Sequence, residues 1–275
     1  MSQDIFHILE GWEFSPDQIA VRSIRGDDGR EKIQMRLDLG LLQMEVDGRP
    51  DGQRPQGCES WLDHYRQLQR GQDARNPDGP PFVLDGEACE RLLREGIQYY
   101  HRYLSFWHLK RYELCARDTT RNLRLFQFVR DYADDERQRR RFDQWRPYVT
   151  MMHTRAVATP LVELGQYEAA LGAIDAGIRG IRRFLEEYNQ SERADQCPEL
   201  APLERWRDQI AARHLPRIEA EPAADEAEVA VMDNIERLRL RLAEAISEER
   251  FEEAATLRDE IRRLAENPLS GESEG

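Results

Sequence analysis

The sequence predicts a mainly α-helical protein: an array of α-hairpins, with a small β-hairpin or meander at the N-terminus and an antiparallel helical hairpin at the C-terminus. Strand-like alternation of apolar and polar residues is confined to residues 1–56. Helical spacing of apolar residues dominates residues 57–215. Two matched apolar stripes then occupy residues 229–267, which predicts a second, smaller helical unit.

The β-like part begins with a short extended run around Val21. The turn sequence Gly26-Asp27-Asp28-Gly29 separates it from an alternating run that covers Ile33–Leu39. The alternation changes phase near Gly40-Leu41, which predicts either a bulge or a bend into a third strand. Because two strands alone are marginally stable, we expect their apolar face to lie on the helices that follow.

The helical part begins with a helix predicted over residues 58–70, followed by a Gly/Pro-rich loop over residues 71–83. Asp85 then has the character of an N-cap for a long helix. Pro147 and Pro160 predict that the third long helix is kinked or split. We expect breaks between helices near Lys110, Asp134, Gly165 and Tyr188–Pro198.

Three expected helix-to-helix elbows share an aromatic residue followed by glutamate, at Tyr112, Tyr167 and Phe251. The glutamate favours the positive end of the helix dipole. The pattern L-G-x-Y-x-x-A-L at Leu164–Leu171 resembles tetratricopeptide repeats, whose usual period is about 34 residues. Ordinary antiparallel helix pairs are the alternative interpretation, and both predict a stacked array.

After the array, residues 216–228 are rich in Pro, Ala and acids and are predicted to be a flexible linker. Residues 268–275 are predicted to be a disordered tail. Between them, two apolar stripes with steps of three and four face each other across an elbow at Ser247–Arg250, which indicates a narrow coiled-coil seam. The stripes are Ile235, Leu238, Leu242 and Ala245, and then Ala254, Leu257, Ile261 and Leu264.

The run F-E-E-A-A-T-L-R-D-E-I at Phe251–Ile261 resembles the UVR motif of the bacterial excision-repair proteins UvrB and UvrC. The motif also occurs in the unfoldase ClpC and the kinase activator McsA. The resemblance implies a bacterial protein that uses the hairpin, without catalytic residues, to bind a partner protein or a second copy. The implied partner-binding residues are Leu238, Leu242, Phe251, Glu252, Ala254, Ala255, Leu257, Arg258, Asp259, Ile261 and Leu264. Leu240 is added as an apolar residue off the seam, which we expect a second hairpin to cover.

Composition excludes several classes of protein. The net charge of -13 disfavours nucleic acid as a partner, except through a local basic patch such as Arg137–Arg141, whose acidic neighbours instead indicate an ion-paired helix start. The first residues lack the basic region of a signal peptide, and no apolar stretch reaches the roughly 20 residues of a membrane span. We therefore expect a cytoplasmic protein without a membrane partner.

No catalytic constellation is visible. The cysteines, Cys58, Cys89, Cys115 and Cys197, form no C-x-x-C pair, so we expect free thiols and no metal site. His101 and His108 share a helix but lack a third ligand, and we expect them to serve packing. No phosphate-binding loop or other cofactor motif appears, so no cofactor is expected.

The leading hypothesis is therefore a non-enzymatic adaptor that docks or dimerises through its UVR hairpin. An accessory factor of nucleotide excision repair that contacts UvrA, UvrB, UvrC or DNA is the first alternative. A regulator of a Clp-type protease or a protein kinase is the second.

Overall fold

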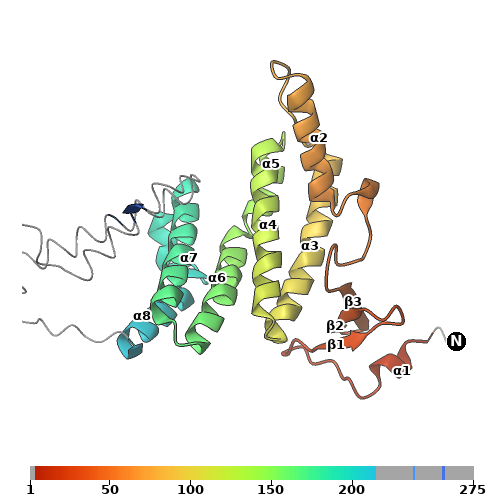
Figure 1. Ribbon diagram of the computed structural model, residues 1–275, viewed down its shortest axis with the longest axis vertical. Helices are drawn as coiled ribbons and strands as arrows, with labels where there is room; N and C mark the ends of the chain where they lie inside the picture. Colours follow the sequence, from red (N-terminus) through yellow and green to blue (C-terminus); the bar gives the residue numbers. More distant parts are fainter. Residues whose placement is uncertain (1–3, 215–237, 239–255, 258–275) are drawn as a thin grey trace, which may run out of the picture. The chain divides into compact units, whose positions relative to one another are not determined.

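The computed structural model describes residues 4–214, Leu238 and residues 256–257, and the chain divides into two compact units, Met1–Leu215 and Pro216–Gly275. The first unit is mainly helical with a small antiparallel sheet near the N-terminus, which confirms the predicted fold class (Figure 1). The predicted linker over residues 216–228 and the predicted tail over residues 268–275 lie outside the described residues. Within those residues, no helix combines the length and apolar character needed to cross a bilayer.

The sheet has three strands in chain order: β1 (Val21–Arg25), β2 (Glu31–Leu37) and β3 (Gly40–Glu45). The change of phase in the sequence is therefore a bend into a third strand rather than a bulge. Met35 pairs with Leu42, so residues of opposite parity share one face after the two-residue turn. Leu39, which the alternation placed within a strand, instead lies in that turn and is 91% exposed.

Both faces of the sheet are covered. Ile33, Met35 and Met44 are buried in a core that includes α3, which confirms that the apolar face lies on the following helices. On the polar face, the Arg22 side chain donates to the Gln34 amide oxygen at 2.8 Å and to the backbone oxygen of Ile8 at 3.0 Å. The N-terminal segment, with the short helix α1 (Phe6–Leu9), therefore contacts this face, which the sequence did not predict.

The first long helices begin at side-chain caps. Helix α2 (Trp61–Arg75) follows a 3-10 turn, η1 (Pro55–Gly57), and starts where Ser60 accepts a hydrogen bond from the Asp63 amide. The prediction of a helix over 58–70 was wrong at both ends, because Ser60 caps the helix and Gly71 is tolerated inside it. Helix α3 (Gly86–His108) is capped by Asp85, as predicted.

The remaining helices form an array in which long helices pack mainly on neighbours in the chain: α3 on α4, α4 on α6, α6 on α7 and α7 on α8 (Figure 1). The predicted split of the third helix occurs between α5 and α6, just before Pro147, whereas Pro160 lies inside the last turn of α6. The bounds are α4 (Tyr112–Tyr132), α5 (Glu136–Asp143), α6 (Arg146–Glu163), α7 (Tyr167–Glu187), η2 (Ser191–Gln196) and α8 (Leu200–His214).

Helices α3, α6 and α7 end with the same backbone motif. In each, one residue adopts a left-handed conformation: Lys110 with φ 57°, Gly165 with φ 73° and Asn189 with φ 52°. The amide after each of these residues bonds to a carbonyl five positions earlier, as in a Schellman motif. The positions 110, 165 and 189 are unequally spaced, so the elbows do not define a regular repeat of the tetratricopeptide kind.

Lys110 adopts a backbone conformation that favours glycine, and Gly165 occupies the equivalent position at the end of α6. Exchanging the residue type at each position tests this conformation. We expect Lys110→Gly to raise the free energy of unfolding by about 0.5–1 kcal/mol, because it relieves the left-handed strain of a side-chain-bearing residue. Gly165→Ala introduces that strain at the equivalent position and should lower the free energy by about 1 kcal/mol. Urea denaturation of the two variants checks both signs, and a loss of stability in Lys110→Gly would contradict the assignment.

Candidate interaction sites

Three residues of the predicted UVR hairpin are described: Leu238, Thr256 and Leu257. Leu238 and Leu257, one from each apolar stripe, are helical and only 6% and 4% exposed. Burial at both positions agrees with their predicted place on the seam. The other predicted partner-binding residues lie outside the described residues: Leu240, Leu242, Phe251, Glu252, Ala254, Ala255, Arg258, Asp259, Ile261 and Leu264.

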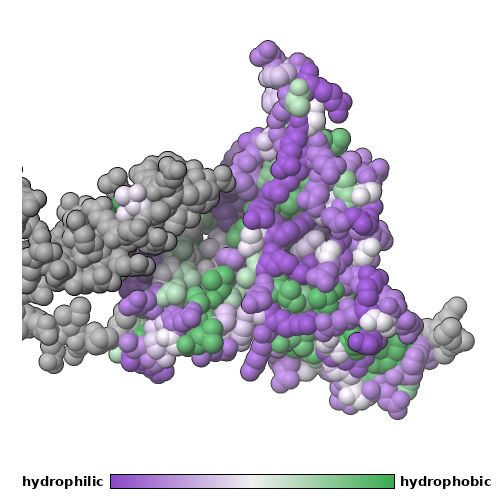
Figure 2. Space-filling view, viewed as in Figure 1, coloured by the Kyte–Doolittle hydropathy of each residue, from purple (hydrophilic) through white to green (hydrophobic). Residues whose placement is uncertain are grey.

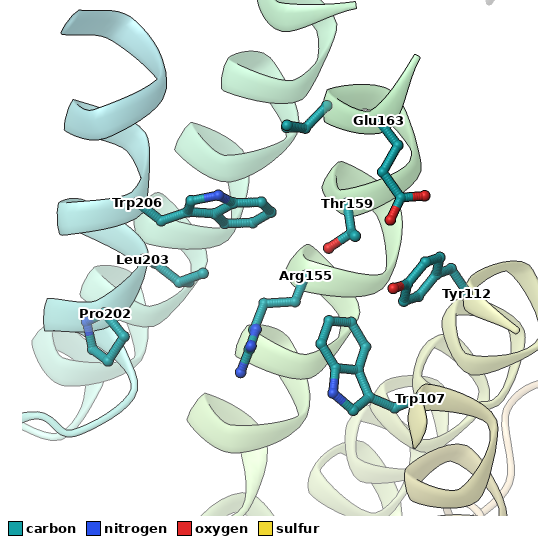
Figure 3. Close-up of a pocket in the computed structure, with 9 residues that line it drawn as sticks. Trp107, Tyr112, Arg155, Thr159, Glu163, Pro202, Leu203 and Trp206 are labelled. Atoms are coloured by element: carbon teal, nitrogen blue, oxygen red, sulfur yellow. The ribbon is translucent and has the colours of Figure 1, made fainter. Parts of the chain in front are cut away.

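The first unit contains a groove, which we call the α6 groove, with a volume of about 430 Å³ (Figure 3). Its floor is one face of α6, because positions 155, 159, 162 and 163 recur at helical spacing. The α3–α4 elbow supplies one wall and the first half of α8 supplies the other. The lining residues are Trp107, Tyr112, Arg155, Thr159, Val162, Glu163, Pro202, Leu203 and Trp206.

The walls of the α6 groove are aromatic. Trp206 projects from α8 on one side, opposite Trp107 and Tyr112 of the elbow (Figure 3). The rings of Trp107 and Tyr112 contact each other with centroids 5.3 Å apart. Leu203 is 1% exposed and anchors this part of α8 in the core of α6–α8. The three aromatic side chains are half-buried, so they offer partly exposed ring faces to the groove.

Two opposite charges lie on the floor of the groove. The Arg155 guanidinium stacks on the Trp107 ring, 4.7 Å from its centroid, and Glu163 lies two turns further along α6. Neither side chain has a hydrogen bond or an ion pair with the described part of the chain. Burial raises the pKa of Tyr112; the Glu163 carboxylate adds to this rise and Arg155 opposes it. Both charges therefore remain available to a ligand.

The sequence did not reveal the α6 groove. Its residues come from three separate segments, and the sequence pattern placed only Tyr112, at an expected helix-to-helix elbow. A partial signal existed in α6, where Arg155, Thr159 and Glu163 recur every four residues and form a polar stripe. The stripe alone does not show that α8 returns to face it.

The basic cluster at Arg137–Arg141 is an ion-paired helix start, as its acidic neighbours indicated. Asp135 caps α5, and Arg140 pairs with Glu136 at 2.6 Å. Arg139 donates to the backbone oxygen of Ala133, and Arg141 pairs with Glu90 of α3. Three of the four guanidinium groups in the cluster are therefore engaged by contacts within the molecule.

The described cysteines are free, with Cys89, Cys115 and Cys197 buried. Burial raises the pKa of Cys115 to about 12 and that of Cys89 to about 11, so neither is suited to act as a thiolate. Among residues 4–214, 238 and 256–257, no group of three or more His, Cys, Asp or Glu side chains is placed to hold a metal ion.

Three histidines make the stability of the fold depend on pH. Burial lowers the pKa of His153, whose Nδ1 lies 3.1 Å from the Thr119 hydroxyl, and it lowers the pKa of His101 and His108. Below an unfolded-state pKa of about 6.5, the unfolded chain therefore binds more protons than the native protein. The stability that neutral histidine contributes is present above that pH and is lost as pH falls.

We therefore expect the urea midpoint to fall between about pH 7 and about pH 5, and His153→Gln to show a smaller fall over the same range. Between about pH 7.5 and pH 8.5, where histidine is neutral in both states, the difference between the two proteins should stay constant. Identical slopes from pH 7 to pH 5 would contradict the burial of a neutral His153.

The fold and the two sites define a helical-array protein with a separate C-terminal segment in which Leu238 and Leu257 are buried. Residues 233–267 match the family model of the UvrB/uvrC motif, UVR, which confirms the resemblance of the C-terminal stripes. No curated protein and no solved structure shows a significant match to the chain.

Proposed function

We propose that the protein is a non-enzymatic adaptor that uses its UVR segment to dock on a partner protein or on a second copy. The match of residues 233–267 to the UVR motif carries this proposal. The burial of Leu238 and Leu257 supports it, because both stripes then supply apolar seam residues. Two short helices bury too little surface to be stable by a wide margin, so a partner that covers their remaining apolar side would stabilise them.

Paired substitutions on the second stripe test this proposal. Leu257→Asp together with Ile261→Asp should abolish capture of a partner and reduce any dimer to a monomer, measured by pull-down and by mass in solution. Leu269→Asp, the same change just outside the matched segment, is the control and should alter neither. If the doubly substituted protein still folds by circular dichroism and retains both partner and mass, the docking role is wrong.

The first alternative function is an accessory role in nucleotide excision repair, which the name of the matching motif favours. In that case UvrA, UvrB or UvrC would be retained by the full chain and lost from a chain without residues 233–267. DNA itself is a weaker candidate, because the net charge is -13. Salt-dependent DNA binding would favour this alternative, and no binding at low salt would count against direct contact.

The second alternative is regulation of a Clp-type protease or a protein kinase, which the resemblance to UVR segments of ClpC and McsA suggests. Co-purification with an unfoldase through residues 233–267 would support it. Capture of a repair protein by the same segment would instead favour the first alternative.

A further inference from the structure

We propose that the α6 groove is a second docking site, which binds an extended segment of a partner protein that carries an acidic and a basic residue about four positions apart, with proline or aliphatic residues between them. The groove belongs to the first unit, whereas the UVR segment belongs to the second. The inference therefore goes beyond the proposed docking function and does not depend on it.

The aromatic walls favour an apolar, conformationally restricted segment. Trp206 faces Trp107 and Tyr112 across the groove, so side chains that enter between them meet ring surfaces on both sides (Figure 3). Proline-containing segments in the extended polyproline conformation dock in aromatic-lined grooves of this kind, because little conformational entropy is lost on binding. The face drawn in Figure 2 is mainly hydrophilic, with apolar residues in separate small patches, including one over the ends of α6 and α7.

The two floor charges set the signs and the spacing of the charges that the ligand must carry. Arg155 presents a guanidinium that no carboxylate in the described chain neutralises, and Glu163 presents the opposite charge. Along a helix with a rise of about 1.5 Å per residue, these positions are about 12 Å apart. An extended chain covers about 3.3 Å per residue, so the matching ligand charges lie about four residues apart. The Thr159 hydroxyl, between the two, faces the middle of the segment.

The aromatic walls and the two floor charges together favour an extended ligand. A single extended strand of about four residues spans the length between the charges. A helix would need about eight residues to cover the same length.

Two peptides test the proposal by calorimetry with the full chain. One is acetyl-Ala-Glu-Pro-Ala-Ala-Lys-Ala-amide, and the other has glutamine in place of both charged residues. Because a chain bound in one direction along the groove places Glu at Arg155 and Lys at Glu163, we expect the charged peptide to bind about tenfold more tightly, a difference of about 1.4 kcal/mol. The doubly substituted protein, Arg155→Gln with Glu163→Gln, should bind the two peptides with equal affinity.

Single substitutions separate the groove from the rest of the surface. Trp206→Leu should weaken binding of the preferred peptide at least tenfold. Trp145→Leu, a change at a 54% exposed tryptophan outside the groove, should leave the affinity unchanged. Arg155 and Glu163 are exposed, so their replacement by glutamine leaves the core intact.

Three results would overturn the proposal: no binding of either peptide below about 1 mM, equal affinities of the unsubstituted protein for the charged and the neutral peptide, or a preference for the charged peptide that persists in the doubly substituted protein. A mass in solution that grows with concentration and is restored to monomer by Arg155→Glu would assign the groove to a second copy instead of a partner.

Discussion

Arg102→Met is expected to lower the free energy of unfolding by about 3–5 kcal/mol, the largest effect of any single substitution considered. The guanidinium is 1% exposed and makes two hydrogen bonds, at 2.6 Å and 3.0 Å, to the Asp118 carboxylate, which is equally buried. It also donates to the backbone oxygens of Glu45 and Gly48, at 2.9 Å and 2.8 Å. Methionine fills similar space but leaves a buried carboxylate and two carbonyl groups without this donor.

The energy of this pair is measured by urea denaturation. Arg140→Met is the matched control, since Arg140 pairs with Glu136 while both side chains are about 70% exposed, and it should cost less than about 0.5 kcal/mol. Arg102→Met combined with Asp118→Leu removes both buried charges and should recover part of the loss. A loss below about 1 kcal/mol for Arg102→Met alone would show that the pair is not buried as described.

Arg102 also explains how the sheet is attached to the helical array. Its two carbonyl partners lie at the end of β3 and in the following turn, whereas Asp118 lies on α4. Glu95, which is fully buried on α3, joins α3 to α2 in the same way. It accepts hydrogen bonds from the Trp61 and Leu62 amides at the start of α2. We therefore expect Arg102→Met to increase amide exchange in residues 45–48 more than in α6 or α7.

These buried charges mark the limit of what the sequence predicts. Local signals defined many boundaries correctly, because Asp85 caps its helix and Gly165 ends one through contacts within a few residues. The partners of Arg102 and Glu95 are far along the chain, so helical periodicity gives no sign that these two charges lie inside. The α6 groove escaped prediction for the same reason, since its walls meet only after α8 packs on α7.

The second large effect concerns the closest approach of α6 and α7. Gly177 is buried on α7, and a Cβ atom placed there would lie 2.7 Å from Thr154 Cγ2 and 2.8 Å from Thr154 Cβ, and would also meet Thr154 Oγ1. Real Cβ contacts essentially never come this close, so one of the two helices must move. We expect Gly177→Ala to lower the free energy of unfolding by about 1–3 kcal/mol through overpacking.

The control lies on the same helix. A Cβ at Gly172 would meet nothing within 4 Å, so Gly172→Ala should raise the free energy of unfolding by about 0.5–1 kcal/mol, because alanine restricts the unfolded chain. The same substitution should therefore change the free energy of unfolding in opposite directions at two positions of α7. Thermal and urea denaturation both resolve this difference. Combining Gly177→Ala with Thr154→Ala should recover only part of the loss, since the Thr154 Cβ contact remains. Two stabilising alanines would show that α6 and α7 are further apart than described, and the floor of the α6 groove would then be displaced relative to α8.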